Sequence, residues 1–439
     1  MTGYRPPTAL PRSALEHADM RAAIRNHDFG AVFRLARVLG GISYSKIAAE
    51  CGIKPERVGT LARGQGRVAS FEKVACIADA LRIPGAMLGL AVRPWEAAAA
   101  NSPVQDQLSD EDQDVVQRRQ FLRASTGAGL AAAVPDLARP AYGRRLGKDL
   151  PERLRRRTAR LRRLDDVLGG GDTYRVYMGE YQATKALLRD GSCTEETRWG
   201  LLSVLAEQAQ QAGWAAFDGG READARGLYE ESRSAAFEAG DSELAGNALA
   251  FLAYQAVDGD RGAGLETARE SCRTIGPGAP AGVRALLHER LAWACAVAGL
   301  ATETERALES AREALASVDG SPQPDWVAWV DHTELQIMTG RCWTELRRPL
   351  RAVPVLESAL ASYDDSHARD KALYTSWLAD SYLTAGEVEQ AAAATGRALD
   401  LADGVASVRP RARLAPLLTR LAAHQQSPTV AAVLEQAAG

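Results

Sequence analysis

Aromatic residues make up only 6% of this 439-residue chain, and runs of β-branched residues are scarce, so a fold built mainly of sheets is disfavoured. Alanine and glycine are abundant instead, which favours helices that pack closely through small side chains. The formal net charge is −3, so any attraction to nucleic acid has to come from local charge. A chain of this length exceeds one compact core, and we expect two or more units.

Motifs for catalysis and for metal binding are missing. The six histidines show neither an HExxH pattern nor paired-ligand spacing, and the six cysteines form no CxxC pair. The chain also lacks a GxSxG elbow, a Walker-type loop and a dinucleotide fingerprint. We therefore predict a protein that is not an enzyme, has no metal and no cofactor, and keeps its cysteines reduced in the cytoplasm.

One internal segment imitates an export signal. Arg118-Arg119 precede a stretch rich in Ala, Gly and Leu, as in a twin-arginine signal. The segment lies behind a whole domain, however, and its apolar part is shorter than the ~20 residues that span a bilayer. We expect a buried or docking helix here and no membrane partner.

The segment from Asp28 to Leu90 has the pattern of five short helices. Apolar residues from Phe29 to Leu39 define the first helix, Ser43 can cap the second, and Gly52 supplies a tight turn before the third. Between Asp28 and Trp95 there are ten Lys and Arg residues against five Asp and Glu, a local charge of about +5. A small basic helical domain is predicted.

A helix-turn-helix pattern in this domain resembles the Cro/repressor (XRE) family. The matching positions are Ile47-Ala48, Cys51-Gly52-Ile53, Val58, Leu61 and Arg63-Gly64. The resemblance implies that the helix beginning near Lys54 enters the major groove of DNA and that the Tyr44 end of the preceding helix contacts the backbone. Two residues depart from the family: Tyr44 stands where Gln is usual, and Pro55 offers no donor at an early recognition position.

The expected DNA contacts follow from side-chain chemistry. Arg57 can engage guanine O6 and N7, and Glu56 can accept a hydrogen bond from cytosine N4. Lys46 and the later arginines suit phosphate contacts. The complete predicted set is Tyr44, Ser45, Lys46, Lys54, Glu56, Arg57, Thr60, Arg63 and Arg67. The alternative for each is an ordinary solvated side chain.

A long helix is predicted from Pro151 to the glycine run Gly169-Gly170-Gly171, with leucines on one stripe and arginines opposite. The arginine face, from Arg153 to Arg163, is expected to be solvated. The alternative is a second surface that contacts phosphate.

Beyond this helix the sequence repeats. Five segments share pairs of small residues nineteen apart: Gly213 and Ser232, Ala253 and Cys272, Ala292 and Ala311, Gly340 and Ala359, and Ala379 and Ala398. Small facing side chains let the two helices of a pair approach closely, and stacking of pairs buries the apolar faces that one pair leaves open. We therefore predict an all-α protein whose C-terminal part is an α-solenoid of about five helix pairs, capped by a helix near Arg411 to Ala423.

These offsets resemble the tetratricopeptide repeat. The family's Trp in the first helix is absent, and the first small residues of successive pairs lie 39 to 48 positions apart, more than the family's ~34. The two-part architecture is similar to that of actinobacterial regulators, and the stretches Leu164 to Thr173 and Gly213-Trp214 add to this resemblance.

The tetratricopeptide resemblance also implies a ligand groove. In that family the residue after the first small position, and those three and six before it, face the concave side. An aromatic row beside amide and charged groups would suit an extended peptide. The predicted groove residues are Glu207, Trp214, Asn247, Tyr254, Trp293, Arg341 and Asp380. The alternative is a solenoid that serves only for structure or for dimer formation.

The predicted organisation is a flexible arm (1–26), a helix-turn-helix DNA-binding domain (27–95), a linker with one apolar segment (96–150), a helical adaptor (151–198) and the solenoid with its capping helix (199–439). These parts predict a transcriptional regulator that binds double-stranded DNA as a homodimer and responds to a peptide, small-molecule or protein effector. The alternative is a protein–protein interaction scaffold with auxiliary DNA binding.

Overall fold

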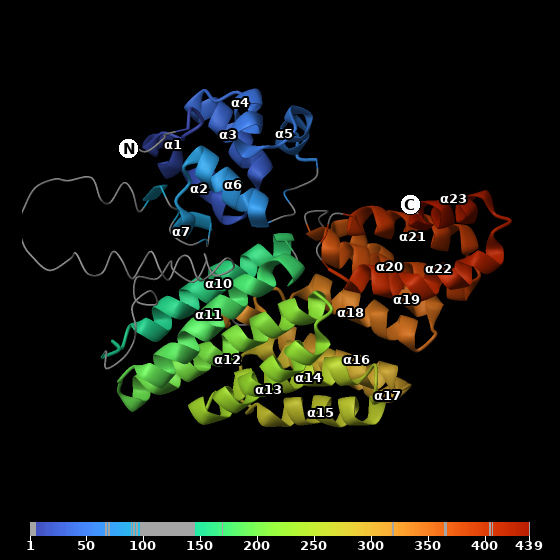
Figure 1. Ribbon diagram of the computed structural model, residues 1–439. Helices are drawn as coiled ribbons and strands as arrows, with labels where there is room; N and C mark the ends of the chain where they lie inside the picture. The colour runs from blue at the N-terminus through green and yellow to red at the C-terminus, as the bar shows by residue number, and fades with distance from the viewer. Residues whose placement is uncertain are drawn as a thin grey trace, which may run out of the picture. The chain divides into compact units, whose positions relative to one another are not determined.

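The computed structural model describes residues 6–65, 68, 71–88, 90, 93, 95–96, 145–168, 170–317, 320–363, 367–403, 405 and 407–438. Within these ranges the secondary structure is helical apart from one isolated bridge between Arg145 and Ser192, so the protein is all-α as predicted. The chain forms two compact units, one of Met1–Leu168 with Asp172–Cys193 and one of Gly169–Gly171 with Thr194–Gly439 (Figure 1). Among the described residues, no helix combines the length and hydrophobicity that a membrane crossing requires.

The first unit begins with seven short helices. They are α1 (Arg12–Glu16), α2 (Ala18–Arg25), α3 (Phe29–Gly40), α4 (Tyr44–Cys51), α5 (Pro55–Ala62), α6 (Phe71–Leu81) and α7 (Gly85–Leu88). The five helices predicted between Asp28 and Leu90 correspond to α3 to α7. Phe33, Ile47 and Ile77 are fully buried in one apolar core that these helices share.

The flexible arm predicted over residues 1–26 is wrong for the part that the structure describes. Residues 12–16 and 18–25 form α1 and α2, and Met20 and Ile24 are fully buried in the apolar core that the short helices share. Thr8 is buried as well, and its Oγ1 donates to the carbonyl oxygen of Ala80 at 2.6 Å. The prolines suggested an open chain, but Pro11 in fact stands directly before α1, where a missing N–H costs nothing.

Two long helices are also described in the first unit. They are α10 (Leu150–Leu168) and α11 (Gly170–Asp190), joined at the predicted glycine run. Leu154 and Leu161 are buried, as the leucine stripe predicted, and Arg157 Nε lies 2.6 Å from Glu180 Oε2. The predicted linker lies almost wholly outside the described residues, and so does its Arg118-Arg119 segment.

The second unit contains five consecutive helix pairs, consistent with a helical repeat array. The pairs are α12 (Glu195–Asp218) with α13 (Glu222–Ala239), α14 (Ser242–Ala256) with α15 (Arg261–Thr274), α16 (Ala281–Val297) with α17 (Ala301–Ala316), α18 (His332–Glu345) with α19 (Pro349–Ser362), and α20 (Ala368–Ala385) with α21 (Val388–Ala402). The first helices of successive pairs also contact one another, so they form a continuous layer through the array (Figure 1).

The small residues lie where the repeat pattern placed them. One member of each nineteen-residue pair is on the first helix and the other on the second, and nine of the ten are buried, Cys272 being partly buried. A Cβ on Gly213 would come within 2.5 Å of the Tyr229 ring, which shows why this position excludes a larger side chain. Seven residues after the first small position, Gly220, Gly299 and Gly386 have positive φ and turn the chain into the second helix.

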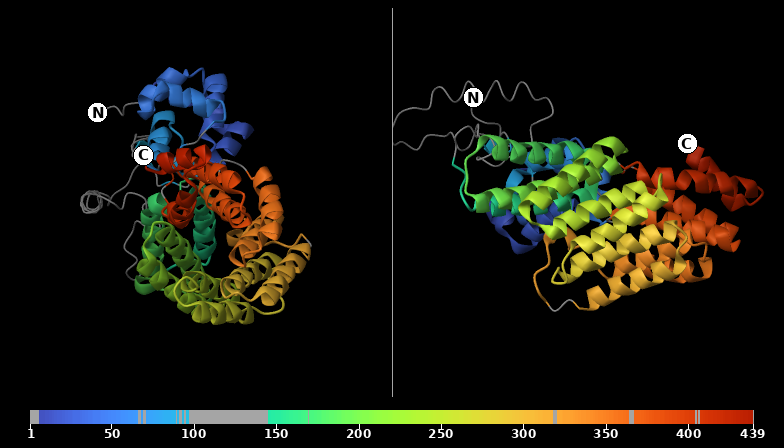
Figure 2. Two further views of the ribbon diagram at one scale, coloured as in Figure 1. Left: turned by 90° about the vertical axis from the view of Figure 1, so that its right-hand side faces the viewer. Right: turned by 90° about the horizontal axis from the view of Figure 1, so that it is seen from below.

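The last two helices, α22 (Arg409–Leu421) and α23 (Pro428–Ala438), follow the fifth pair. The predicted capping helix corresponds to α22. The segment before α22 returns to the first pair, where Val408 N–H donates to the Asp218 carbonyl oxygen at 3.0 Å and Ser407 Oγ donates to Asp218 Oδ1 at 2.8 Å. The array therefore closes on itself, and its curvature can be followed in Figure 2.

Candidate functional site

Local sequence builds the α4–α5 motif. Ser43 Oγ accepts a hydrogen bond from the Lys46 N–H at 3.4 Å and so caps α4. Gly52 follows α4 with a φ of 59°, a left-handed conformation that glycine adopts without strain. Pro55 is the first residue of α5, where its fixed φ suits a helix and its missing N–H is not needed.

Contacts beneath α5 fix its orientation. Val58 and Leu61 are buried, and a Cβ on Gly30 would clash with the Leu61 carbonyl, so α3 and α5 approach each other closely. Arg34 Nη1 donates to the Ala62 carbonyl oxygen at 2.7 Å, at the C-terminal end of α5. The helix is thus held against α3 while its opposite face stays in solvent.

Most of the predicted DNA contacts lie on this exposed surface. The exposed members of the set are Ser45, Lys46, Lys54, Glu56, Arg57 and Arg63. Tyr44 is partly buried, and the Arg37 guanidinium, which the sequence did not single out, lies 5.1 Å from its ring centre. Thr60 is partly buried and its Oγ1 donates to the Glu56 carbonyl oxygen. Arg67 lies outside the described residues.

A second candidate site lies on the layer of first helices in the array. Trp214 and Tyr254 have ring centres 6.3 Å apart, and Tyr254 lies 6.3 Å from Trp293. Trp377 continues the row, with its ring centre 5.8 Å from that of Trp293. We call the surface formed by these four rings the inner face. The aromatic side chains that the sequence analysis placed in one row thus lie next to one another, and Trp377 extends the row to α20.

Arg341 occupies the centre of the inner face. Its guanidinium carbon lies 4.1 Å from the ring centre of Trp377 and 4.6 Å from that of Trp293, and its Nη2 donates to Tyr254 Oη at 3.1 Å. Only 4% of the residue is exposed. Stacking between two indoles stabilises the cation because a ring face carries negative charge.

Arg409, from α22, covers the other end of the row. Its guanidinium carbon lies 4.5 Å from the Trp214 ring centre, its Nη1 is 3.6 Å from Asp218 Oδ1, and its Nη2 also donates to Tyr254 Oη. The residue is absent from the predicted set because it lies 155 positions from Tyr254 in the sequence. Only the closure of the array brings it to the inner face.

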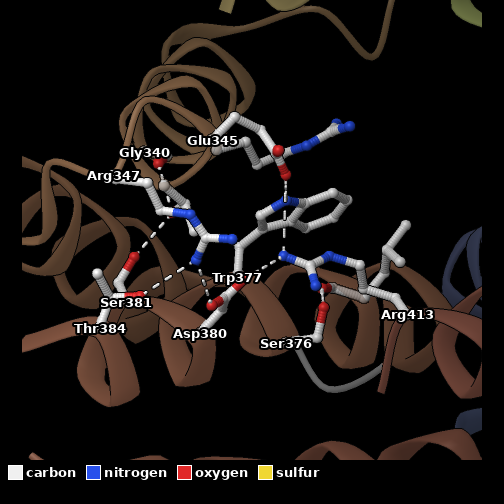
Figure 3. A network of polar contacts seen from close by, with 12 residues as sticks. Gly340, Glu345, Arg347, Ser376, Trp377, Asp380, Ser381, Thr384 and Arg413 are labelled. Atoms are coloured by element: carbon white, nitrogen blue, oxygen red, sulfur yellow. Dashed lines mark hydrogen bonds and ion pairs between the residues drawn. The ribbon is translucent and has the colours of Figure 1, made fainter. Parts of the chain in front are cut away.

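Asp380 is the centre of a separate arginine cluster (Figure 3). Its carboxylate accepts hydrogen bonds from Arg413 at 2.7 Å, from Arg347 at 3.3 Å and from Arg420. Burial raises the pKa of a carboxyl, but these arginines outweigh it and hold the pKa of Asp380 below its usual value. Arg413 joins the cluster to the inner face, since its guanidinium lies 5.2 Å from the Trp377 ring centre.

Two predicted groove residues are buried in the packing between helices and are not part of the aromatic row. Asn247 is 5% exposed and its Nδ2 donates to Gln210 Oε1 at 2.7 Å, across α12 and α14. Glu207 is buried in α12. Of the seven predicted residues, Trp214, Tyr254, Trp293 and Arg341 share one contact network, to which Asp380 connects through Arg413 and Trp377.

Three charged residues near Tyr254 and Arg341 are not in the predicted groove set: Glu289, which is buried, and Arg290 and Glu334, which are partly buried. Glu334 stands six residues before Gly340, an offset that the family resemblance places on the concave side. Glu289 stands three residues before Ala292, an offset at which the family resemblance already placed groove-facing side chains. All six cysteines are free.

Comparison with protein-family models finds no match, and no curated protein shows significant sequence similarity to the chain.

Proposed function

We propose that the protein is a cytoplasmic, sequence-specific transcriptional regulator with a helix-turn-helix domain of the Cro/repressor (XRE) kind. In this proposal α5 is the recognition helix, and the array of tetratricopeptide-like pairs supplies dimerisation and effector sensing. The main support for the proposal is the way α5 packs. Apolar side chains hold one face of α5 against α3, while Lys54, Glu56 and Arg57 are exposed on the other side.

The chemistry of this face suits DNA. A helix fits the major groove, and a guanidinium or a carboxylate on its outer side can discriminate bases by hydrogen bonding. Lys46 at the start of α4 and Arg63 after α5 are exposed, and both can neutralise phosphates. The close approach of α3 and α5 supports the proposal as well, because a recognition helix that is already held rigidly loses little conformational entropy when it binds DNA.

Dimerisation follows from the small footprint of one such domain. A lone helix-turn-helix domain reads a short half-site, and two half-sites about one helical turn apart need two domains on a common support. The array is the largest other folded part that the structure describes, so we assign the dimer contact to it.

The experiment that tests the proposal is capture of genomic DNA fragments by the full-length protein, followed by sequencing. A short, recurrent inverted repeat among the captured fragments is expected. Fragments without a shared site would contradict specific regulation and favour an interaction scaffold with auxiliary DNA binding. Sedimentation of the free protein, expected at the mass of a dimer, tests the assembly separately.

A further inference from the structure

Two arginines beside the inner face have no carboxylate partner among the residues that the structure describes. Neither Arg290 nor Arg341 lies within 4.0 Å of an Asp or Glu oxygen of the described residues. Arg341 is 96% buried, since only 4% of it is exposed, and no acceptor among the described atoms reaches its Nε. Arg290 makes no hydrogen bond to a described residue, and its guanidinium lies 5.0 Å from the Tyr254 ring centre.

Tyr254 brings three cations together at one point. Its hydroxyl oxygen accepts hydrogen bonds from both Arg341 and Arg409, each at 3.1 Å, while Arg290 stands over its ring. Burial raises the pKa of a phenol, but these guanidinium groups outweigh it and lower the pKa of Tyr254 to about 8. Arg409 has its own counter-ion in Asp218, whereas the other two arginines have none in the described part of the chain.

The nearest acidic side chains do not neutralise this charge. Glu289 is 1% exposed, its Oε1 has no hydrogen-bond partner, and burial raises its pKa to about 8. Glu334 accepts hydrogen bonds from Tyr363 and Tyr374, and burial raises its pKa to about 7. Burial therefore favours the protonated form of both carboxyls, which leaves an excess of positive charge beside Tyr254.

We infer that Arg290, Arg341 and Tyr254 form a binding site for an oxyanion, a carboxylate or phosphate group carried by the effector. A buried cation without a counter-ion is costly, and an anion that pairs with it recovers that cost. Guanidinium groups match carboxylate and phosphate oxygens through paired N–H donors, and Arg341 Nε is a donor still available.

Solvent reaches the Arg290 side chain itself. Arg290 is partly exposed, and its guanidinium lies 5.7 Å from the ring centre of Trp329, which is 42% exposed. Trp329 belongs to the connection between α17 and α18, where the repeat spacing is longest at 48 residues. The additional residues of this connection, including the short helix η2 (Asp325–Val327), thus place an aromatic side chain beside the site.

The inference rests on the proposed function only in saying that the anion belongs to an effector. Anion binding itself can be measured without DNA. The full-length protein without DNA is titrated with inorganic phosphate in one series and with succinate in another, against sodium chloride at equal ionic strength. Anion binding should raise the Tm by about 3 °C at roughly ten times Kd, and it should change tryptophan fluorescence because indoles surround Arg290 and Arg341. A response to one series alone identifies the preferred oxyanion.

Variants assign the response to the site. Arg341→Gln and Arg290→Gln should each abolish the anion-dependent rise in Tm. Arg413→Gln is the matched control, because Arg413 also stacks on Trp377 but is paired with Asp380, and it should respond as wild type does. No shift with either anion, or an unchanged shift in both site variants, would overturn the inference. Either result leaves the DNA-capture experiment unaffected, so the two proposals fail separately.

Discussion

Gly340 on α18 faces the side chain of Leu356 on α19 so closely that a Cβ at position 340 would lie 2.6 Å from Leu356 Cδ2. Leu356 is fully buried and cannot move away freely. We therefore expect Gly340→Ala to destabilise the array by ~1–3 kcal/mol through overpacking, although alanine is the better helix former. Urea unfolding monitored by circular dichroism measures the loss.

The matched control is Gly227→Ala in α13. This glycine is exposed, and a Cβ there would meet no atom within 4 Å. Helix propensity then acts alone, and the variant should gain ~0.5–1 kcal/mol. Equal effects of the two substitutions would contradict the assignment of position 340 as a contact between the paired helices.

Arg57→Ala should weaken binding to the preferred DNA site by ~1–3 kcal/mol and relax the preference at one base pair, because Arg57 is exposed on the proposed recognition helix. Lys46→Ala should weaken binding to all sequences alike and reduce the dependence of affinity on salt. Fluorescence anisotropy with site and scrambled duplexes measures both.

Arg21→Ala serves as the control for these two variants. Arg21 is an exposed arginine of the same domain, but it belongs to α2 rather than to α4 or α5. It should bind as wild type does. A loss for Arg21→Ala equal to that for Arg57→Ala would indicate general charge attraction instead of recognition by α5.

Glu289→Gln should remove part of the pH dependence of stability. The pKa of Glu289 is raised by burial from an ordinary value of 4.5 to about 8, so the folded state prefers the protonated form. Its contribution to stability is complete below about pH 4.5 and is lost as pH rises to about 8. The free energy of unfolding of Glu289→Gln should therefore fall less than that of wild type between these limits, by on the order of 2–5 kcal/mol.

Chemical denaturation across this pH range measures that difference. Glu389→Gln, at an exposed position of α21, should keep the pH dependence of the wild type. Parallel curves for wild type and Glu289→Gln would show that Glu289 titrates normally in the folded protein.

Asp218→Asn should destabilise the protein by ~3–5 kcal/mol. The Asp218 carboxylate is fully buried within 4.0 Å of both Arg369 and Arg409. Without it Arg369 keeps its ion pair with Asp370, but the largely buried Arg409 loses its ion-pair partner among the described residues. Asp224→Asn, on the exposed side of α13, should change stability by less than ~0.5 kcal/mol. Denaturation at neutral pH compares the two, and similar losses would show that the Asp218 carboxylate is not needed.

The sequence could predict the helix pairs because their defining contacts are short-range. A small residue such as Gly340 and its partner Ala359 belong to adjacent helices, so the requirement for close packing repeats along the chain. The turn position could be predicted for the same reason. In the fourth pair Arg347 replaces glycine there and still has a positive φ of 56°, because the backbone path is set by the two helices it joins.

The sequence could not predict the charged part of the inner face, since its contacts join distant segments. Arg341 and Tyr254 are 87 positions apart, and Arg409 and Tyr254 are 155 apart. No periodic signal marks such pairs, and the arginines of α22 resemble an ordinary solvated helix face in the sequence. The burial of α1 and α2 could not be predicted for a related reason. Their apolar side chains are buried by contacts with α3 and α7, which are formed only in the folded domain.

The hydrogen bond from Val408 to Asp218 changes how the array is expected to unfold. In an open row of repeats each pair contacts only its neighbours, so the end pairs fray first and stability accumulates pair by pair. Here the C-terminal end of α12 and the start of α22 protect each other, and neither can open locally without breaking the contact of the other. Amide hydrogens in these two segments should exchange together, at the rate of global unfolding rather than of fraying ends.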